Sequence, residues 1–293
     1  MTNTRRTLYI LFILLAAGAL LGGVFGKKTW HRLENILAKE EPVSPALRPE
    51  ISVRFLEGWN NTEMGEYLEK QTSWSKKDWL DVVGYPREDH SSSLDLSARY
   101  SLLADKPANA GLEGYLYPDT YRIFASSSTP EDLVIKMLDN LDKRLTPKMR
   151  ADIASQGKSI FEIMTMASLL EKEAPINYTN GDNKDAKIIA GIFWDRIKNG
   201  QALQSCASLA YILGVNKPQY SAEDTQVESP YNTYQNRGLP PGPISNPGIL
   251  AIEAAIYPTY TNYNYFLTPS GSKDIIYAAT YEEHLRNKRQ YLP

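Results

Sequence analysis

The sequence predicts an α+β fold, in which a few short strands and several longer helices occupy separate stretches of the chain. Residues 51–55 alternate apolar and polar side chains, as a half-buried strand does. Residues 160–170 are apolar on almost every side, which is typical of a buried core helix. Near the C-terminus, residues 264–268 and 275–279 flank a turn sequence and predict a β-hairpin.

The composition excludes several classes of protein. The chain has 293 residues and a formal net charge of −2 at pH 7, so its charge gives no reason to expect a nucleic-acid partner. The single cysteine, Cys206, rules out an intrachain disulfide. His31, His90 and His284 lack the spacing of a zinc signature, and we predict neither a metal nor another cofactor.

The N-terminus predicts a membrane anchor. Residues 8–25 are uncharged and about as long as a short membrane span requires, with basic residues on both sides. A secretory signal peptide is the alternative, but the apolar run is long for one and no clear cleavage site follows it. We therefore expect a cytoplasmic tip and an uncleaved single-pass helix at 1–28, with most of the chain outside the cytoplasm. Residues 29–50 are polar and predict a stalk.

Residues 51–125 predict a small α+β module. Ser75 and Asp78 have the spacing of a capping box, and Gly84 is placed to end the helix that they start. The expected elements are a strand at 51–55, helices from Asn60 or Asn61 to about residue 70, from 75 to 84 and from 94 to 104, and a closing strand at 119–124.

Residues 126–293 predict a second, mainly helical region. Thr129 followed by Pro130 is a strong helix start, and Thr280 with Glu283 indicates a capping box for the last helix. Residues 220–247 predict a long irregular loop, which in a compact domain is usually functional. Further helices are expected at 160–173, 186–198 and 249–256, and the hairpin precedes the last helix.

The helix that starts at residue 160 ends in two carboxylates, Glu171 and Glu173, just before Pro175. Burial and the negative end of the helix dipole both disfavour a charged carboxylate there. Both effects raise its pKa, which suits a general acid near neutral pH. Residues two apart point roughly 200° apart on a helix, so at most one glutamate faces a cleft. Alternatively, both lie on a solvated helix end without a chemical role.

Several stretches, taken in order, resemble the endolytic murein transglycosylase family, the YceG-like proteins. The resemblance extends from about residue 50 to the C-terminus, and its motifs lie at 111–121, 166–173, 191–200, 203–205, 229–234, 238–243 and 263–266. It implies a single-pass protein of the plasma membrane. It also implies a LysM-like module at 51–125 and an extracytoplasmic lytic transglycosylase domain of mixed helices and strands at 126–293.

The resemblance further implies that nascent peptidoglycan strands are cut internally between MurNAc and GlcNAc, which limits strand elongation. In this family one glutamic acid protonates the glycosidic oxygen and then accepts the C6 hydroxyl proton, leaving a 1,6-anhydro-MurNAc end. This mechanism differs from that of two-carboxylate hydrolases, which need a second carboxylate and a water molecule. The implied partners are glycan strands and the membrane, and the family allows cell-wall synthases as well. The alternatives are a weakly active or inactive peptidoglycan-binding scaffold of the same fold, and a muramidase that uses water.

Matching the motifs residue by residue places the catalytic acid at Glu173, with Glu171 as the alternative. Ala174 follows it where the family often has Thr, and Cys206 stands where the family usually has Asp. The residues expected to contact substrate are Glu113, Tyr115, Arg196, Gln204, Tyr231, Asn232 and Tyr234.

Each expected contact has a structural alternative. An amide such as that of Asn232 pairs well with an N-acetyl group, and tyrosine rings suit sugar faces, yet these residues also suit bracing of the long loop. Arg196 suits a surface ion pair on its helix, and Glu113 suits the capping of a turn.

Overall fold

The computed structural model describes residues 50–90, 96–124, 127–217, 219–269, 271–272 and 274–292. The predicted membrane helix at 8–25, and the stalk up to residue 49, lie outside these ranges. Contacts divide the chain into Met1–Arg48 and Pro49–Pro293, and the second unit is described here. Within the part of the chain that the structure describes, no helix has both the length and the hydropathy needed to cross a membrane.

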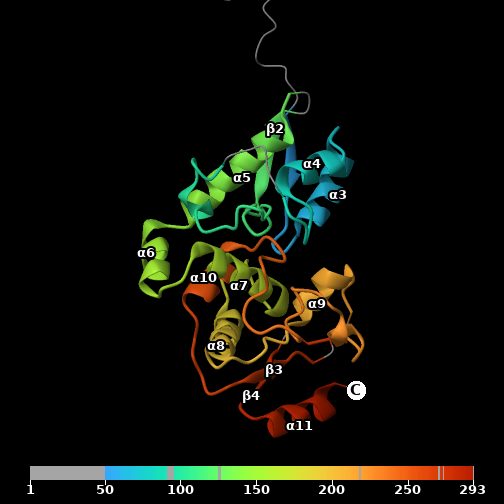
Figure 1. Ribbon diagram of the computed structural model, residues 1–293, viewed down its shortest axis with the longest axis vertical. Helices are drawn as coiled ribbons and strands as arrows, with labels where there is room; N and C mark the ends of the chain where they lie inside the picture. The colour runs from blue at the N-terminus through green and yellow to red at the C-terminus, as the bar shows by residue number, and fades with distance from the viewer. Residues whose placement is uncertain are drawn as a thin grey trace, which may run out of the picture. The chain divides into compact units, whose positions relative to one another are not determined.

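The first elements form a strand pair with helices beside it (Figure 1). Strand β1 (Glu50–Arg54) pairs antiparallel with β2 (Thr120–Phe124), as the sequence predicts. Helix α3 (Asn61–Gln71) packs against α4 (Lys76–Val83), and α5 (Pro130–Arg144) packs against both α4 and β2. The predicted caps at Asn60, Ser75 and Thr129 all form capping boxes.

The helix predicted at 94–104 is wrong for the residues described there. Residues 96–104 form turns and the short 3₁₀ helix η2 (Ser101–Leu103). Tyr100 has an extended backbone instead, and its hydroxyl donates to Asp139 on α5 at 2.6 Å. Leu102 and Leu103 are then both buried, so tertiary contacts override the local helical spacing.

Helix α7 (Ile160–Glu173) is the centre of the second region (Figure 1). It packs against α6 (Pro147–Ser155), α8 (Lys184–Lys198), α9 (Cys206–Leu213) and α10 (Ile249–Ile256). All side chains from Ile163 to Leu170 are buried, which the apolar sequence predicts. Helices α6 and α9 are absent from the predictions, although Thr146-Pro147 repeats the start signal of α5.

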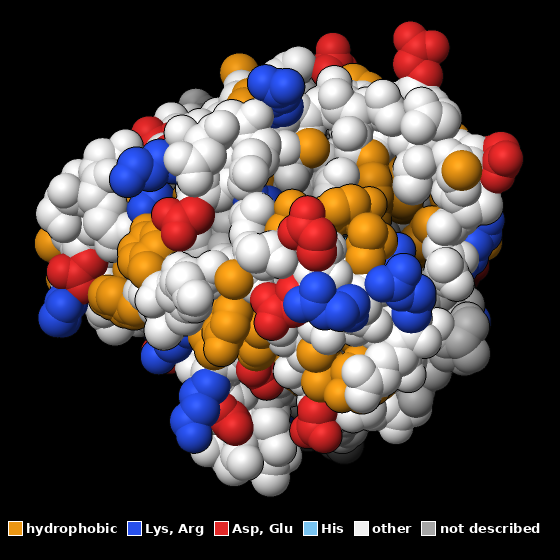
Figure 2. All heavy atoms as spheres, turned by 90° about the horizontal axis from the view of Figure 1, so that it is seen from below, with side chains coloured by type: hydrophobic (Ala, Val, Ile, Leu, Met, Phe, Trp, Pro, Cys, Tyr) orange, Lys and Arg blue, Asp and Glu red, His pale blue; other side chains and the backbone are white. Residues whose placement is uncertain are grey.

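The C-terminal elements follow the predicted order. Strands β3 (Tyr265–Leu267) and β4 (Ile276–Ala278) form an antiparallel hairpin, and α11 (Tyr281–Tyr291) packs on both. Figure 2 views the molecule from below and shows hydrophobic side chains in several groups, with charged side chains of both signs between them. Helix and strand together confirm the α+β class. The LysM-like nature of 51–125 and the boundary near residue 125 stay predictions.

Candidate active site

Glu173 is the last residue of α7, and its side chain is half-buried. Its Oε1 atom accepts hydrogen bonds from Ser205 Oγ at 2.5 Å and from the backbone N–H of Ala207 at 2.9 Å. Ser205 is the N-cap residue of α9 and Ala207 lies in its first turn, so the positive end of that helix dipole faces the carboxylate. One oxygen of the acid is thereby fixed in place.

The pKa of Glu173 is set by opposing effects. Burial is the largest, and it raises the pKa above the ordinary value because a low-dielectric environment disfavours the charge. The donors at Ala207 and Ser205 and the positive charge of Arg196 lower it again. The net shift is upward, so the neutral acid persists to a higher pH than in an exposed glutamate.

Glu171 points away from this site. Its Oε2 atom accepts from the Tyr178 hydroxyl at 2.5 Å and from the Gly248 N–H at 2.9 Å. Gly248 is the N-cap residue of α10, so Glu171 joins the end of α7 to the start of α10. Burial raises the pKa of Glu171 as well. The two glutamates thus separate onto different sides of α7, in agreement with the helical spacing.

A cavity of about 460 Å³ is lined by three of the expected substrate-contact residues, Arg196, Gln204 and Tyr234. Glu173 is not part of this lining, but it lies close to it, because Ser205, which donates to Glu173, directly follows Gln204. Gln204 precedes Ser205 in the chain, and the Tyr234 hydroxyl lies 3.3 Å from Cys206 Sγ at the start of α9. The structure therefore brings these three residues together around the candidate acid.

Arg196 is buried and holds this wall of the cavity in place. Its guanidinium donates to the carbonyl oxygen of Leu203 and, through Nε at 3.2 Å and Nη2 at 2.6 Å, to that of Asn264. It also lies 5.6 Å from the centre of the Tyr265 ring. Arg196 forms no ion pair with the residues that the structure describes, so its structural alternative, a surface ion pair on α8, is not seen there, and a substrate contact stays a prediction.

Gln204 has an unusual backbone. Its φ of 52° lies in the left-handed region, which non-glycine residues seldom adopt and which often marks functional sites. The backbone N–H donates to the Thr233 carbonyl at 3.0 Å. Because Leu203 and Ser205 on either side are both buried, the left-handed turn directs the Gln204 side chain outward, where it is exposed.

Two other expected contact residues, Glu113 and Tyr231, line a separate cavity of about 400 Å³. Glu113 is buried and accepts from the Asn61 N–H and from Asn246 Nδ2, each at 3.0 Å. Burial, the largest effect, raises its pKa to about 8. Tyr211 lines the same cavity from the far part of α9. The structure does not bring Glu113 or Tyr231 into the cavity beside Glu173.

The remaining two expected residues are fully buried. The Tyr115 hydroxyl finds no hydrogen-bond partner among the residues described. Asn232 donates from Nδ2 to the carbonyls of Thr225 at 3.1 Å and Val227 at 2.7 Å, and its Oδ1 accepts from the Tyr234 N–H at 3.0 Å. In this arrangement Asn232 braces the long loop and positions Tyr234. A sugar contact by either residue stays a prediction.

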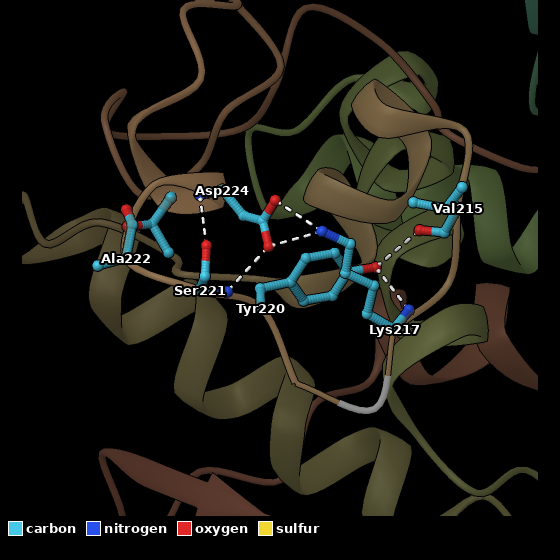
Figure 3. A network of polar contacts seen from close by, with 7 residues as sticks. Val215, Lys217, Tyr220, Ser221, Ala222 and Asp224 are labelled. Atoms are coloured by element: carbon cyan, nitrogen blue, oxygen red, sulfur yellow. Dashed lines mark hydrogen bonds and ion pairs between the residues drawn. The ribbon is translucent and has the colours of Figure 1, made fainter.

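A polar network fixes the segment that Asn232 holds (Figure 3). Lys217 Nζ lies 2.8 Å from Asp224 Oδ1, and Asp224 also accepts from the Ser221 N–H at 2.9 Å. The Tyr220 hydroxyl donates to the Val215 carbonyl at 3.0 Å. These bonds hold together the loop between α9 and the 3₁₀ helix η3 (Asp224–Gln226). The carbonyl groups that accept from Asn232 follow directly in the chain.

Sequence reasoning missed the donors that hold the acid. Ser205 belongs to a recognised motif, but the N–H of Ala207 becomes visible only once α9 is known. Asn246 was also missed: its Oδ1 accepts from the Gly114 and Leu116 N–H groups at 2.9 and 3.0 Å. Within the ranges described, no three or more His, Cys, Asp or Glu side chains gather as a metal site would require.

The fold and the site together define an α+β protein that presents one half-buried glutamate where the end of a core helix meets the start of another helix. The YceG-like family model matches residues 23–290, and the chain belongs to this family.

Named relatives and a solved structure agree with this membership. An endolytic murein transglycosylase of Bacillus subtilis (strain 168) is 30% identical over 247 residues, covering 83% of this chain and 65% of the relative. One from Streptococcus pneumoniae serotype 2 (strain D39) is 37% identical over 193 residues, covering 64% of this chain and 34% of the relative. A crystal structure of a putative YceG-like protein from Listeria monocytogenes has a TM-score of 0.69 and 31% identity, covering 80% of this chain and 75% of that one. The matches thus span just under two thirds of the Bacillus relative and about one third of the pneumococcal one.

Proposed function

We propose that this protein is a lytic transglycosylase that cuts nascent peptidoglycan glycan strands internally, between MurNAc and GlcNAc, and leaves 1,6-anhydro-MurNAc ends. The observation that carries the proposal is the arrangement of Glu173. One carboxyl oxygen is held by Ser205 and Ala207, while burial favours the neutral acid that the first chemical step requires. The relatives named as endolytic murein transglycosylases support the same activity.

The chemistry follows from that geometry. Two donors occupy Oε1, so the proton of neutral Glu173 resides on Oε2. Oε2–H protonates the glycosidic oxygen as the C1–O bond breaks, and the GlcNAc side leaves with a new hydroxyl. The Glu173 carboxylate then takes the proton of the muramic C6 hydroxyl, O6 bonds to C1 and the 1,6-anhydro ring closes. The glutamate ends protonated, and water takes no part.

The fixed donors also suit the second half of this cycle. Glu173 must carry a negative charge for the lifetime of the sugar cation, and two hydrogen bonds from a helix start stabilise that charge. Arg196 contributes further positive charge from the cavity wall. Burial and these donors act in opposite directions on the pKa, so neither protonation state is so stable that the acid cannot alternate between them.

The proposal includes where the reaction takes place. The apolar run at 8–25 supports a single-pass anchor in the plasma membrane, with a LysM-like module at 51–125 and the catalytic region on the extracytoplasmic side. A site so anchored would act on strands close to the membrane and shorten them during synthesis. Cell-wall synthases are the class of partner that such a position brings near.

The product of the reaction tests the function. The full chain is incubated with uncrosslinked glycan strands, and the products are analysed by mass spectrometry. A lytic transglycosylase gives new ends that are lighter by one water than hydrolytic ends. Reducing ends would make the protein a muramidase. Intact strands, from protein shown by circular dichroism to be folded, would instead indicate a peptidoglycan-binding scaffold.

A further inference from the structure

The cavity beside Glu173 is positively charged. It is lined by two arginines, Arg196 and Arg237, and by no aspartate or glutamate, although the chain as a whole has a formal net charge of −2. Lys288 on α11 adds positive charge near this end of α9: burial and the Glu173 charge raise the pKa of Cys206, and the Lys288 charge acts against them. The other large cavity differs, since Glu88, Asp89 and Glu113 all line it.

The two arginines of this cavity have different roles. Arg196 uses its guanidinium for the backbone carbonyls of Leu203 and Asn264 and is buried. The Arg237 side chain is exposed, and it forms no hydrogen bond or ion pair with the residues that the structure describes. Its backbone forms an antiparallel bridge with Ala202, two residues before Gln204. The Arg237 backbone is therefore fixed at the edge of the cavity, while its guanidinium has no charge partner among the residues described.

The rest of the lining is rigid and rich in hydrogen-bonding groups. Gln204 projects from its left-handed turn, and Asn264 and Tyr265 are held by Arg196. The amide nitrogen of Gln235 donates to the Thr225 carbonyl at 2.9 Å and to Gln226 Oε1, which fixes its side chain. Side-chain amides and a guanidinium on one wall can together recognise a carboxylate and the peptide groups that accompany it.

We propose that this cavity binds a carboxylate of the peptidoglycan substrate, with Arg237 as its charge partner and Gln204 as its neighbouring amide donor. The inference rests on the proposed function for the identity of the strand. Its consequence is a preference for strands that carry charged substituents next to the scissile bond. The carboxylate belongs either to the stem peptide or, on strands without peptides, to the lactyl group of muramic acid.

Three strand preparations separate these sources. The first carries stem peptides with their carboxylates, the second is the same material with its carboxylates converted to amides, and the third is stripped of peptides so that only lactyl carboxylates remain. We expect Arg237→Gln in the full chain to lower kcat/KM on the first about tenfold, as loss of a hydrogen bond to a charged group does. On the amidated strands the variant and the wild type should be equal.

A binding measurement makes the test independent of catalysis. Fluorescence anisotropy of labelled strands is followed with Glu173→Gln and with Glu173→Gln/Arg237→Gln. We expect the second change to weaken binding to peptide-bearing strands with free carboxylates and to leave binding to the amidated strands unchanged. Arg54→Gln is the control, because Arg54 on β1 is an exposed arginine with no ion pair in the residues described. A wild type that cleaves nothing would contradict the proposed function, while the binding series would still test the cavity.

The two sources give opposite results on stripped strands. Arg237 dependence there identifies the lactyl carboxylate, and its absence identifies the stem peptide. The inference is overturned if Arg237→Gln weakens binding equally on charged and amidated strands, or if Glu173→Gln binds both kinds of strand with the same affinity.

Discussion

The Ser205 hydroxyl and Glu173 Oε1 are 2.5 Å apart, and this contact joins the start of α9 to the end of α7. Ser205 is in place because Gln204 takes a left-handed backbone and because the Ser205 N–H donates to Thr233 Oγ1 at 3.0 Å. The orientation of the candidate acid therefore depends on Ser205 and Thr233, which lie beyond the end of α7 in the chain, and not on α7 alone.

We expect Ser205→Ala to lower kcat and to move the pH dependence. The hydroxyl stabilises the charged carboxylate, so its loss raises the pKa of Glu173 further. The first step needs the protonated acid, and activity is lost as pH rises through that pKa. The alkaline limb of the kcat/KM profile should therefore shift to higher pH in Ser205→Ala.

The control for this comparison is Ser155→Ala, since Ser155 on α6 is exposed and its hydroxyl donates to the Asp152 carbonyl of the same helix. Its pH profile should match the wild type. An alkaline limb that moves to lower pH in Ser205→Ala would show that the hydroxyl does not stabilise the Glu173 carboxylate.

Isosteric amides distinguish the two glutamates. Glu173→Gln cannot donate the required proton, and we expect activity to fall by at least about 100-fold. Glu171→Gln keeps an oxygen for the Tyr178 hydroxyl and the Gly248 N–H, so we expect activity within about tenfold of the wild type. Release of anhydro ends measures both, with thermal melting to show that each variant folds. Equal losses in the two variants would argue against a single-acid mechanism at Glu173.

Helix α7 could be predicted because its evidence is local. A mostly apolar run at 160–170 and Pro175 define α7 without any tertiary information. The spacing of Glu171 and Glu173 also shows that they diverge. Which glutamate meets α9 could not be derived, because the answer depends on Ser205 and Ala207, whose helix has no strong start signal. Gln204's backbone is set by Thr233, a distant residue that local spacing cannot reveal.

The expected contacts show the same limit. Asn232 and Tyr234 stand two residues apart in one motif, yet one is fully buried and the other lines the cavity. Asparagine and tyrosine side chains suit both loop bracing and substrate contact, and only the path of the loop decides which residue takes which role. Arg237 is the reverse case: no motif singles it out, and its position follows from the backbone bridge to Ala202.

Glu113 should make stability pH-dependent. Its pKa is raised from 4.5 to about 8 in the folded protein, so between these values the folded state holds a proton that the unfolded state has lost. The contribution of Glu113 to the free energy of unfolding is fully present below about pH 4.5 and is lost as the pH rises to 8. Over this range the free energy of unfolding falls by up to about 1.4 kcal/mol per pH unit. Glu113→Gln should flatten that slope.

Urea unfolding at several pH values measures the effect of Glu113. Gln at this position keeps an acceptor for the Asn61 N–H and for Asn246 Nδ2, so the buried contacts survive the substitution. Glu282→Gln is the matched control, because Glu282 is exposed on α11. If wild type and Glu113→Gln lose stability in parallel between pH 5 and 8, the carboxyl at this position is not protonated in the folded protein.

Gly191 allows α8 to approach the chain that leads to the hairpin. A Cβ atom at this position would lie 2.3 Å from the Thr259 carbonyl oxygen, and that backbone is held by a 2.8 Å hydrogen bond from the Thr259 N–H to the Lys187 carbonyl. Gly→Ala within a helix ordinarily stabilises by about 1 kcal/mol. Here the clash is with fixed backbone, and we expect Gly191→Ala to cost about 2 kcal/mol or more.

The same substitution should also affect the site, because Gly191 lies on the helix that carries Arg196. Moving α8 away from residue 259 shifts the guanidinium relative to the Leu203 carbonyl, which it anchors just before Gln204. We therefore expect Gly191→Ala to lose activity at temperatures where it is still folded, whereas Lys198→Ala, on the exposed end of α8, retains it. Full activity in a destabilised Gly191→Ala protein would show that the position of α8 does not set the geometry around Glu173.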